Sequence, residues 1–219
     1  MYYVFNFYKR NVVTYNEFWE YQREQTQSDF SIFGPLYSIY ANDQIYTTGN
    51  GVINKYDKYL NLTTKSNESG FYSGIYFNSS NGLIYSAEKL YKKILTFNQN
   101  LILVDKFNLT YMPMFITEYK GMMIITEISK SSGNIYFYQN NVLIKNITTN
   151  CGQTVNSILF DNFNHMIVLC DVNLYIYHTN GTYTGIGFIN FCTIQSNYIS
   201  FDSKNRLVVL CSDGINLYY

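Results

Sequence analysis

Acidic residues recur at one position of the sequence, directly after an apolar run, and are the first candidates for chemistry. They are Glu88, Glu127, Asp171 and Asp213. Carboxylate oxygens are the ligands that hard divalent cations prefer, so side chains gathered from several parts of the chain could hold a metal. The alternative is that each carboxylate accepts backbone N–H groups in its own turn. We favour this structural role, also for Asp161 and Asp202, because a catalytic site needs different residues from different repeats.

Cysteines form two pairs with the same spacing. The pairs are Cys151 with Cys170 and Cys192 with Cys211. Zinc sites usually show a C-x-x-C pattern, which this sequence does not contain. Cys170 and Cys211 end apolar runs, where cysteine packs as a small hydrophobic residue. We therefore predict buried thiols rather than disulfides or a metal site.

Histidines and catalytic motifs offer few further candidates. His165 is predicted in a hairpin turn and His178 just beyond a strand, and two histidines are too few for a multi-histidine metal centre. The sequence contains no glycine-rich phosphate loop, nucleophile elbow or H-E-x-x-H motif. It therefore predicts no catalytic residue, no enzyme and no cofactor. A divalent cation held by the repeated acids is the alternative.

Tyrosine is the most abundant residue that could bind a partner. The chain has 24 tyrosines and 16 phenylalanines, and many of these rings suit packing between sheets. Four tyrosines fall in predicted turns or loops and are the candidate binding residues: Tyr59, Tyr72, Tyr111 and Tyr183. Exposed tyrosines beside asparagine and serine make adaptable contacts with proteins or sugars. An AT-rich genome would raise tyrosine, asparagine, isoleucine, lysine and phenylalanine together without any functional meaning.

The charge balance argues against nucleic acid as a partner. The chain carries 15 lysines plus arginines and 15 acidic residues, so its formal net charge is zero. Proteins that bind nucleic acid electrostatically usually carry a basic excess. The densest basic cluster, Lys89 with Lys92 and Lys93, is typical of a solvated turn.

Internal repeats determine the predicted fold. Residues 151–171 and 192–212 match without a gap at an offset of 41 residues, sharing cysteine, asparagine, Phe-Asp and an apolar run that ends in cysteine. Residues 74–88 form a third copy, and residues 37–48 and 114–127 are degenerate copies. Turn centres spaced by roughly 37–45 residues are typical of one four-stranded propeller blade for each repeat.

Each copy shows the same order of strands. An apolar strand ends in a polar turn, and a nearly continuous apolar strand such as 207–211 follows. An alternating aromatic strand comes next, and a polar segment such as 145–148 has the composition of an edge strand. The alternating strands are predicted at 53–56, 94–97, 135–138, 174–177 and 215–218.

This order resembles the repeats of NHL and YVTN-type β-propellers from about residue 36 onward. The shared outline is an apolar strand, an F-D-x-x-N turn, an L-V-V-L run, an acidic residue and I-x-x-Y or I-x-x-F. The resemblance implies an all-β ring of four-stranded blades, and RNA binding on one face is a family possibility that the basic clusters of this sequence do not support. It also keeps metal-dependent chemistry open, because gluconolactonase-type propellers use an acidic cluster to hold a divalent metal.

We predict a single propeller domain over residues 1–219. Residues 36–219 supply five repeats, which gives five blades, or six if residues 14–35 contain a degenerate blade. Residues 1–13 resemble the outer half of a blade, and we expect them to pair with the C-terminal blade and close the ring. A capping-box pattern at Thr14–Glu17, followed by aromatic residues at helical spacing, predicts a short helix within 14–35.

Targeting signals are weak in this sequence. Six N-x-S/T sequons occur, at Asn61, Asn67, Asn78, Asn108, Asn146 and Asn180. The 27 asparagines and 34 serines plus threonines predict roughly four sequons by chance, so these six add little. The N-terminal apolar stretch meets Asn6 and Lys9 too early for a signal peptide, and no apolar run reaches the ~20 residues of a transmembrane helix. We expect a soluble protein, intracellular by default.

The predicted function is that of a non-catalytic binding scaffold. We expect a monomer that mediates protein–protein interaction through loops on one face of a rigid ring. A metal-dependent lactonase or related hydrolase is the first alternative, and it requires an acidic cluster that binds a divalent cation. A lectin is the second alternative, and it requires similar glycan pockets in successive blades.

Overall fold

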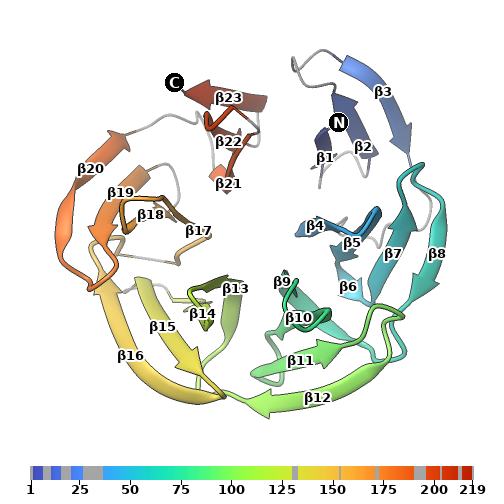
Figure 1. Cartoon of the computed structure of the whole chain (residues 1–219), viewed down its shortest axis with the longest axis horizontal. Coiled ribbons are helices and arrows are strands. Elements are labelled where there is room, and N and C mark those ends of the chain that lie inside the picture. The colour runs from blue at the N-terminus through green and yellow to red at the C-terminus, as the bar shows by residue number, and fades with distance from the viewer. Residues whose placement is uncertain are drawn as a thin grey trace. The chain divides into compact units, whose positions relative to one another are not determined.

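The structure is a computed structural model of the whole chain. It describes residues 2–6, 11–15, 21–26, 37–129, 133–152, 154–170, 173–189, 196–202, 204–211 and 214–218. Side chains are described within 37–211, apart from those of residues 50, 186–189, 196 and 197. All helices or strands assigned within these ranges are β-strands, twenty-three in number, in agreement with the all-β prediction (Figure 1).

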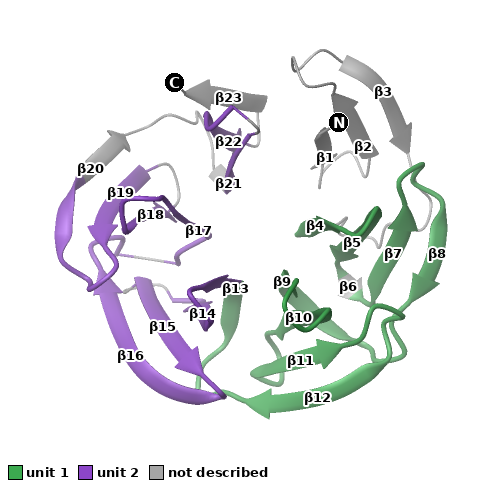
Figure 2. Ribbon diagram, in the orientation of Figure 1, with its two compact units in different colours: residues 1–116 green, residues 117–219 purple. Residues whose placement is uncertain are grey.

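Two compact units, residues 1–116 and residues 117–219, make up the chain (Figure 2). The first unit contains a four-stranded sheet of β4 (Ser38–Ala41), β5 (Gln44–Thr48), β7 (Ile53–Asp57) and β8 (Leu62–Lys65), in that order. A second sheet follows, of β9 (Gly70–Asn78), β10 (Leu83–Glu88), β11 (Lys93–Phe97) and β12 (Leu103–Asn108), with β6 (Asn50–Gly51) paired to β9.

The second unit repeats this arrangement, and its boundary falls within β13. One sheet contains β13 (Pro113–Tyr119), β14 (Met122–Glu127), β15 (Gly133–Gln139) and β16 (Val142–Thr149). The next contains β17 (Ser157–Phe160), β18 (His165–Cys170), β19 (Asn173–His178) and β20 (Tyr183–Ile189). A three-stranded sheet contains β21 (Ser196–Phe201), β22 (Leu207–Cys211) and β23 (Gly214–Tyr218).

The strands predicted from alternation are confirmed. Residues 53–56, 94–97, 135–138, 174–177 and 215–218 lie in β7, β11, β15, β19 and β23. Each is paired antiparallel to the apolar strand that precedes it in the same sheet. The polar segment 145–148 lies in β16, which is the last strand of its sheet, as the edge-strand composition predicts.

One prediction for the N-terminal segment differs from the structure. Strands β1 (Tyr2–Asn6), β2 (Asn11–Tyr15) and β3 (Tyr21–Thr26) pair with one another in a three-stranded sheet. The predicted pairing of residues 1–13 with the C-terminal blade would join the two units, and it stays a prediction. The helix predicted within 14–35 is wrong over Tyr21–Thr26, because pairing with β2 overrides the local helical spacing. The remainder of that predicted helix lies outside the described residues.

Each unit contains its own apolar core between sheets. In the first unit, Tyr46 and Ile53 of one sheet pack with Tyr72, Ile84 and Phe97 of the next. In the second unit, the core comprises Leu169, Leu174, Ile199, Val209 and Cys211, from the last two sheets. Within the first unit, β9 also approaches the start of β13. There, the Ser73 hydroxyl donates to the carbonyl of Pro113 over 2.9 Å.

The cysteine prediction is wrong. Cys151 and Cys170 form a disulfide, and Cys211 is also disulfide-bonded. The burial of Cys170 and Cys211 at the ends of β18 and β22 is confirmed, but these side chains are not thiols. The repeat produces the equal spacing of the two cysteine pairs, and it also places the chain after β16 beside the end of β18. Sequence spacing alone does not show that proximity.

Candidate functional site

Four turns share one hydrogen-bonding pattern. Each connects the first and second strands of a sheet or the third and fourth strands, and these connections lie at the same end of the sheet. We call this end of each sheet the hairpin edge. The first residue of these turns is Asp57, Asn98, Asp161 or Asp202. Its Oδ1 accepts the N–H groups of the second and fourth following residues over 2.8–3.1 Å. The third following residue has a positive φ in every case. The structural role predicted for Asp161 and Asp202 is confirmed.

Glu88 also serves its own turn, at the opposite end of its sheet. Its carboxylate is buried and accepts the backbone N–H groups of Phe71 at 3.0 Å, Leu90 at 3.3 Å and Tyr91 at 2.6 Å. Two of these donors, Leu90 and Tyr91, belong to the turn that follows Glu88, so this carboxylate holds its own turn and also binds the neighbouring strand β9.

Glu127 differs from Glu88 because its donors are side chains. The carboxylate accepts a hydrogen bond from the Asn134 amide and another, at 2.9 Å, from the Tyr136 hydroxyl. Burial and then this hydrogen bond raise the pKa of Tyr136, so the phenol stays protonated as the donor. The prediction of backbone donors does not hold for this residue. Asp171 and Asp213 lie outside the described residues, among which no group of three His, Cys, Asp or Glu side chains could hold a metal ion.

The candidate tyrosines fall into different environments. Tyr59 and Tyr183 are exposed, as predicted, and Tyr111 is partly buried. Tyr72 is 0% exposed, so its prediction as a loop binding residue is wrong. It lies within β9, which begins at Gly70, earlier than the repeat indicates. Its hydroxyl donates to the Glu68 carbonyl over 2.9 Å, and burial raises its pKa to about 12.

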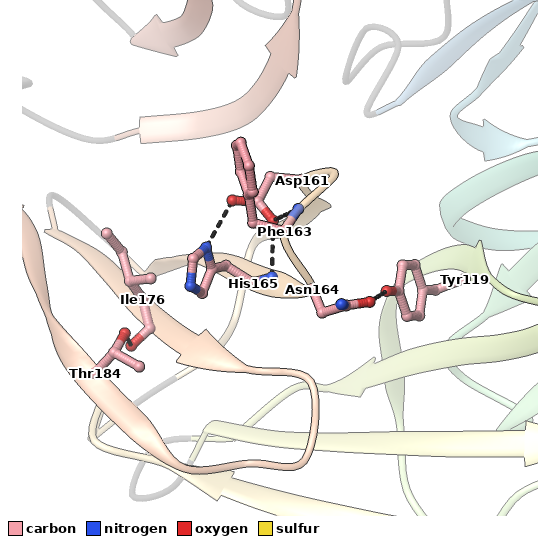
Figure 3. Close-up of polar contacts among 7 residues, drawn as sticks. All are labelled: Tyr119, Asp161, Phe163, Asn164, His165, Ile176 and Thr184. Atoms are coloured by element: carbon pink, nitrogen blue, oxygen red, sulfur yellow. Dashed lines mark hydrogen bonds and ion pairs between the residues drawn. The ribbon is translucent and has the colours of Figure 1, made fainter.

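Three hairpin turns of the second unit meet at Asn164. The Asn164 side-chain oxygen accepts a hydrogen bond at 2.8 Å from the hydroxyl of Tyr119, which ends β13 (Figure 3). The same oxygen accepts a hydrogen bond at 2.7 Å from the ammonium of Lys120 in the β13–β14 turn. Its backbone carbonyl accepts the N–H of Thr179 in the β19–β20 turn at 3.0 Å. Asn164 has a φ of 65°, a conformation that asparagine adopts more readily than most residues. The turn residue that holds this conformation therefore also holds its neighbours in place.

Both histidines lie beside this junction. His165 begins β18 and is paired in register with His178, the last residue of β19, and the two ring centroids lie 5.1 Å apart. The His165 Nδ1 lies 2.8 Å from Asp161 Oδ2 (Figure 3). The pKa of Asp161 lies below its ordinary value. Burial alone would raise this pKa, but the hydrogen bonds from His165 and Phe163 have the larger combined effect.

Aromatic side chains frame the junction. Phe163, at the tip of the Asp161 turn, is 77% exposed and is the most exposed large hydrophobic residue among the described side chains. The Tyr119 ring stacks on Phe160 with centroids 4.2 Å apart, and Tyr183 contacts Tyr177 at 5.4 Å. We define the aromatic hairpin surface as Tyr119, Lys120, Phe163, His165, His178 and Tyr183. Of these residues, Tyr183 is a predicted binding candidate and Phe163 is not, although Phe163 lies within an F-D-x-x-N turn that is recognisable in the sequence.

Comparison with known proteins shows the fold. No family profile matches the sequence, and no curated protein matches it. The structure is similar to the WD40 domain of Neurospora crassa Pan2, with a TM-score of 0.66 and 8% identity, covering 99% of this chain and 74% of that one. It is also similar to hydrazine synthase of Kuenenia stuttgartiensis, with a TM-score of 0.63 and 9% identity, covering 84% of this chain and 57% of that one.

These similarities identify an all-β propeller with four-stranded antiparallel blades that resembles WD40 domains. The propeller and repeat-blade predictions are therefore confirmed. Within the described residues there is no helix long and apolar enough to cross a membrane.

Proposed function

We propose that this chain is a non-catalytic binding scaffold that recognises a protein partner through the aromatic hairpin surface. The repeat order supports an NHL or YVTN-type propeller, and the six sheets support six blades rather than five. The observation that carries the proposal is Phe163, a large apolar side chain 77% exposed on a turn with a fixed conformation.

Rigid aromatic residues suit such a role. Aromatic side chains are enriched among the residues that contribute most to binding at protein interfaces. The Phe163 N–H is fixed by Asp161, and the turn is tied to two others through Asn164. Because the backbone is already ordered, binding through Phe163 loses less conformational entropy than binding through a free loop.

The Asp161–His165 pair supports a structural rather than a catalytic role. The equivalent pair in the next repeat, at an offset of 41 residues, is Asp202 with Arg206, whose Nε lies 2.6 Å from Asp202 Oδ2. Arginine is not a general base, yet it occupies the same turn position with the same backbone hydrogen bonds. A catalytic role would also need a nucleophile. The hydroxyl of the nearby Thr184 donates a hydrogen bond to the Ile176 carbonyl at 2.7 Å (Figure 3).

The test compares Phe163→Ala with Tyr91→Ala. Tyr91 is a similarly exposed aromatic residue, but it lies in the β10–β11 turn, away from any hairpin edge. A partner captured by the full chain is purified and titrated by calorimetry against wild type and both variants. We expect Phe163→Ala to raise Kd at least about tenfold, which corresponds to about 1.4 kcal/mol, and Tyr91→Ala to leave Kd unchanged. Equal affinity for all three chains would contradict the proposal.

A further inference from the structure

Four of the six sequons lie on, or directly before, the outermost strand β8, β12, β16 or β20 of a sheet. Asn61 directly precedes β8, Asn108 ends β12, Asn146 lies within β16, and Asn180 lies in the turn before β20. All four asparagines are exposed. The other two sequons are Asn67, which is exposed between β8 and β9 and accepts the Leu103 N–H with its side-chain oxygen at 3.2 Å, and Asn78, which ends β9 and is only partly exposed. The sequons are therefore concentrated where a large hydrophilic modification could be accommodated.

Three of these asparagines have an accessible amide nitrogen. The Asn61 amide donates to Asp57 Oδ2 at 2.9 Å and is therefore engaged in its turn. Asn180 uses only its oxygen, which accepts the Thr182 N–H at 2.9 Å. Within the described part of the chain, the amide nitrogens of Asn108, Asn146 and Asn180 donate no hydrogen bond. The threonines of these sequons, Thr110, Thr148 and Thr182, are exposed as well.

Exposed apolar side chains accompany two of these sequons. Val104 is exposed on β12, and Val142, Leu143 and Ile144 are exposed in succession on β16. An apolar strand at the end of a sheet is a site for unwanted strand pairing unless something covers it. On β16, where the three exposed apolar residues are consecutive, a glycan at Asn146 would cover the edge, because a branched hydrophilic group on the same strand blocks the approach of another chain.

The disulfides are an independent observation. Disulfides form and persist in oxidising compartments and are rare in the cytosol, where thiols are kept reduced. Cys151–Cys170 closes a 19-residue separation in one blade, and Cys211 is disulfide-bonded at the equivalent repeat position of the next. N-linked glycosylation takes place in the secretory pathway, which is also oxidising, so both observations indicate the same compartment.

We propose that Asn108, Asn146 and Asn180 are N-glycosylation sites and that the chain folds in the oxidising secretory pathway. In the transfer, each Asn Nδ2 forms a bond to the first sugar carbon of a lipid-linked oligosaccharide. The bond from that carbon to the donor pyrophosphate breaks, the lipid pyrophosphate leaves, and the amide loses one proton. Each disulfide forms when two thiols pass two electrons and two protons to a disulfide oxidoreductase. This inference replaces the intracellular default and is independent of the proposed binding role.

The test uses the protein isolated from its own cells. Peptide N-glycosidase converts a glycosylated asparagine to aspartate, and peptide mass spectrometry detects the conversion. We expect conversion at residues 108, 146 and 180, and none at Asn100 or Asn140, which are exposed but outside any sequon. Alkylation before reduction should label no cysteine, and alkylation after reduction should label all four.

Variants assign the sites individually. In a secreting eukaryotic host, N108Q, N146Q and N180Q should each remove one glycan from the full chain, and N140Q should remove none. Unmodified asparagines in the native protein would overturn the glycosylation sites whatever the cysteines show. Cysteines labelled before reduction would overturn the assignment to an oxidising compartment.

Discussion

The same turn position accommodates different side chains because backbone hydrogen bonds, not charge, define it. Asn98 accepts two N–H groups with its amide oxygen as Asp161 and Asp202 do with a carboxylate. The side chain that contacts the second carboxylate oxygen then varies from His165 to Arg206. Repetition of an acid is therefore a reason to look for turn geometry before looking for a metal.

Asp161→Asn separates the charge of this residue from its turn geometry. The amide keeps both backbone hydrogen bonds, as Asn98 shows, and loses the pairing with His165. Because this pair is partly exposed, we expect the variant to lose only about 0.2–1 kcal/mol of unfolding free energy at neutral pH. Urea unfolding of both chains at matched pH measures the difference.

The pH dependence of that difference has a definite sign. The pKa of folded Asp161 lies below its ordinary 3.8, so the unfolded chain takes up the proton first as the pH falls. The stabilisation is present above the unfolded pKa and is lost as the pH falls through the folded value. The difference between wild type and variant should therefore stay constant down to about pH 5 and shrink towards pH 3. A difference that grows in acid would contradict this assignment.

At the scale of elements, sequence periodicity predicts which segments form strands, but it predicts poorly where a strand ends and which strand it pairs with. In β15, for example, Ile135 and Phe137 are buried whereas Asn134 and Tyr136 are only partly buried, and this alternation made the strand recognisable. Tyr72 was misplaced because its burial depends on a strand that extends beyond the repeat. The helix prediction failed at Tyr21–Thr26 because pairing with another strand, which no local pattern reports, decides its conformation.

The candidate site was less predictable than the fold for the same reason. The F-D-x-x-N pattern predicts the turn, but the contacts of Asn164 with Tyr119 and Thr179 join residues 45 and 15 positions apart. The disulfide likewise depends on how a loop returns beside β18. Contacts between sheets are set by packing, and a single sequence carries little information about them.

Gly74 tests how closely β9 approaches residues 114–116, which belong to the first unit. A Cβ on this residue would lie 3.0 Å from the Ile116 nitrogen, 3.0 Å from the Met114 oxygen and 3.1 Å from the Phe115 Cα. These are backbone atoms of β13, so they cannot turn aside as a side chain does. We expect Gly74→Ala to lower the unfolding free energy by about 1–3 kcal/mol through overpacking.

Gly185→Ala is the matched control in another strand. Its added Cβ would meet no atom within 4 Å, and the substitution reduces the conformational freedom of the unfolded chain. We expect it to be neutral or to stabilise by about 0.4–1 kcal/mol. Chemical denaturation of both variants measures the change in unfolding free energy. Equal changes would show that strand conformation, rather than contact with β13, determines the loss of stability.

At the scale of the whole molecule, covalent cross-linking is confined to one unit. All four cysteines belong to residues 117–219, and residues 1–116 contain none. A disulfide that closes 19 residues, as Cys151–Cys170 does, stabilises by about 3 kcal/mol when its main effect is to restrict the unfolded chain. The stability of the second unit should therefore depend on oxidation of its cysteines. The first unit contains no cysteine, and packing of apolar side chains stabilises its core.

Hydrogen exchange with and without reductant measures this difference directly. In the full chain, reduction should lower amide protection in β17–β19 and leave protection in β9–β11 unchanged, because local opening free energies differ between regions with separate cores. The double variant Cys151→Ser/Cys170→Ser should reproduce part of the loss without reductant. If protection fell equally in both sets of strands, the two units would unfold as one cooperative structure, and the disulfides would stabilise the whole propeller.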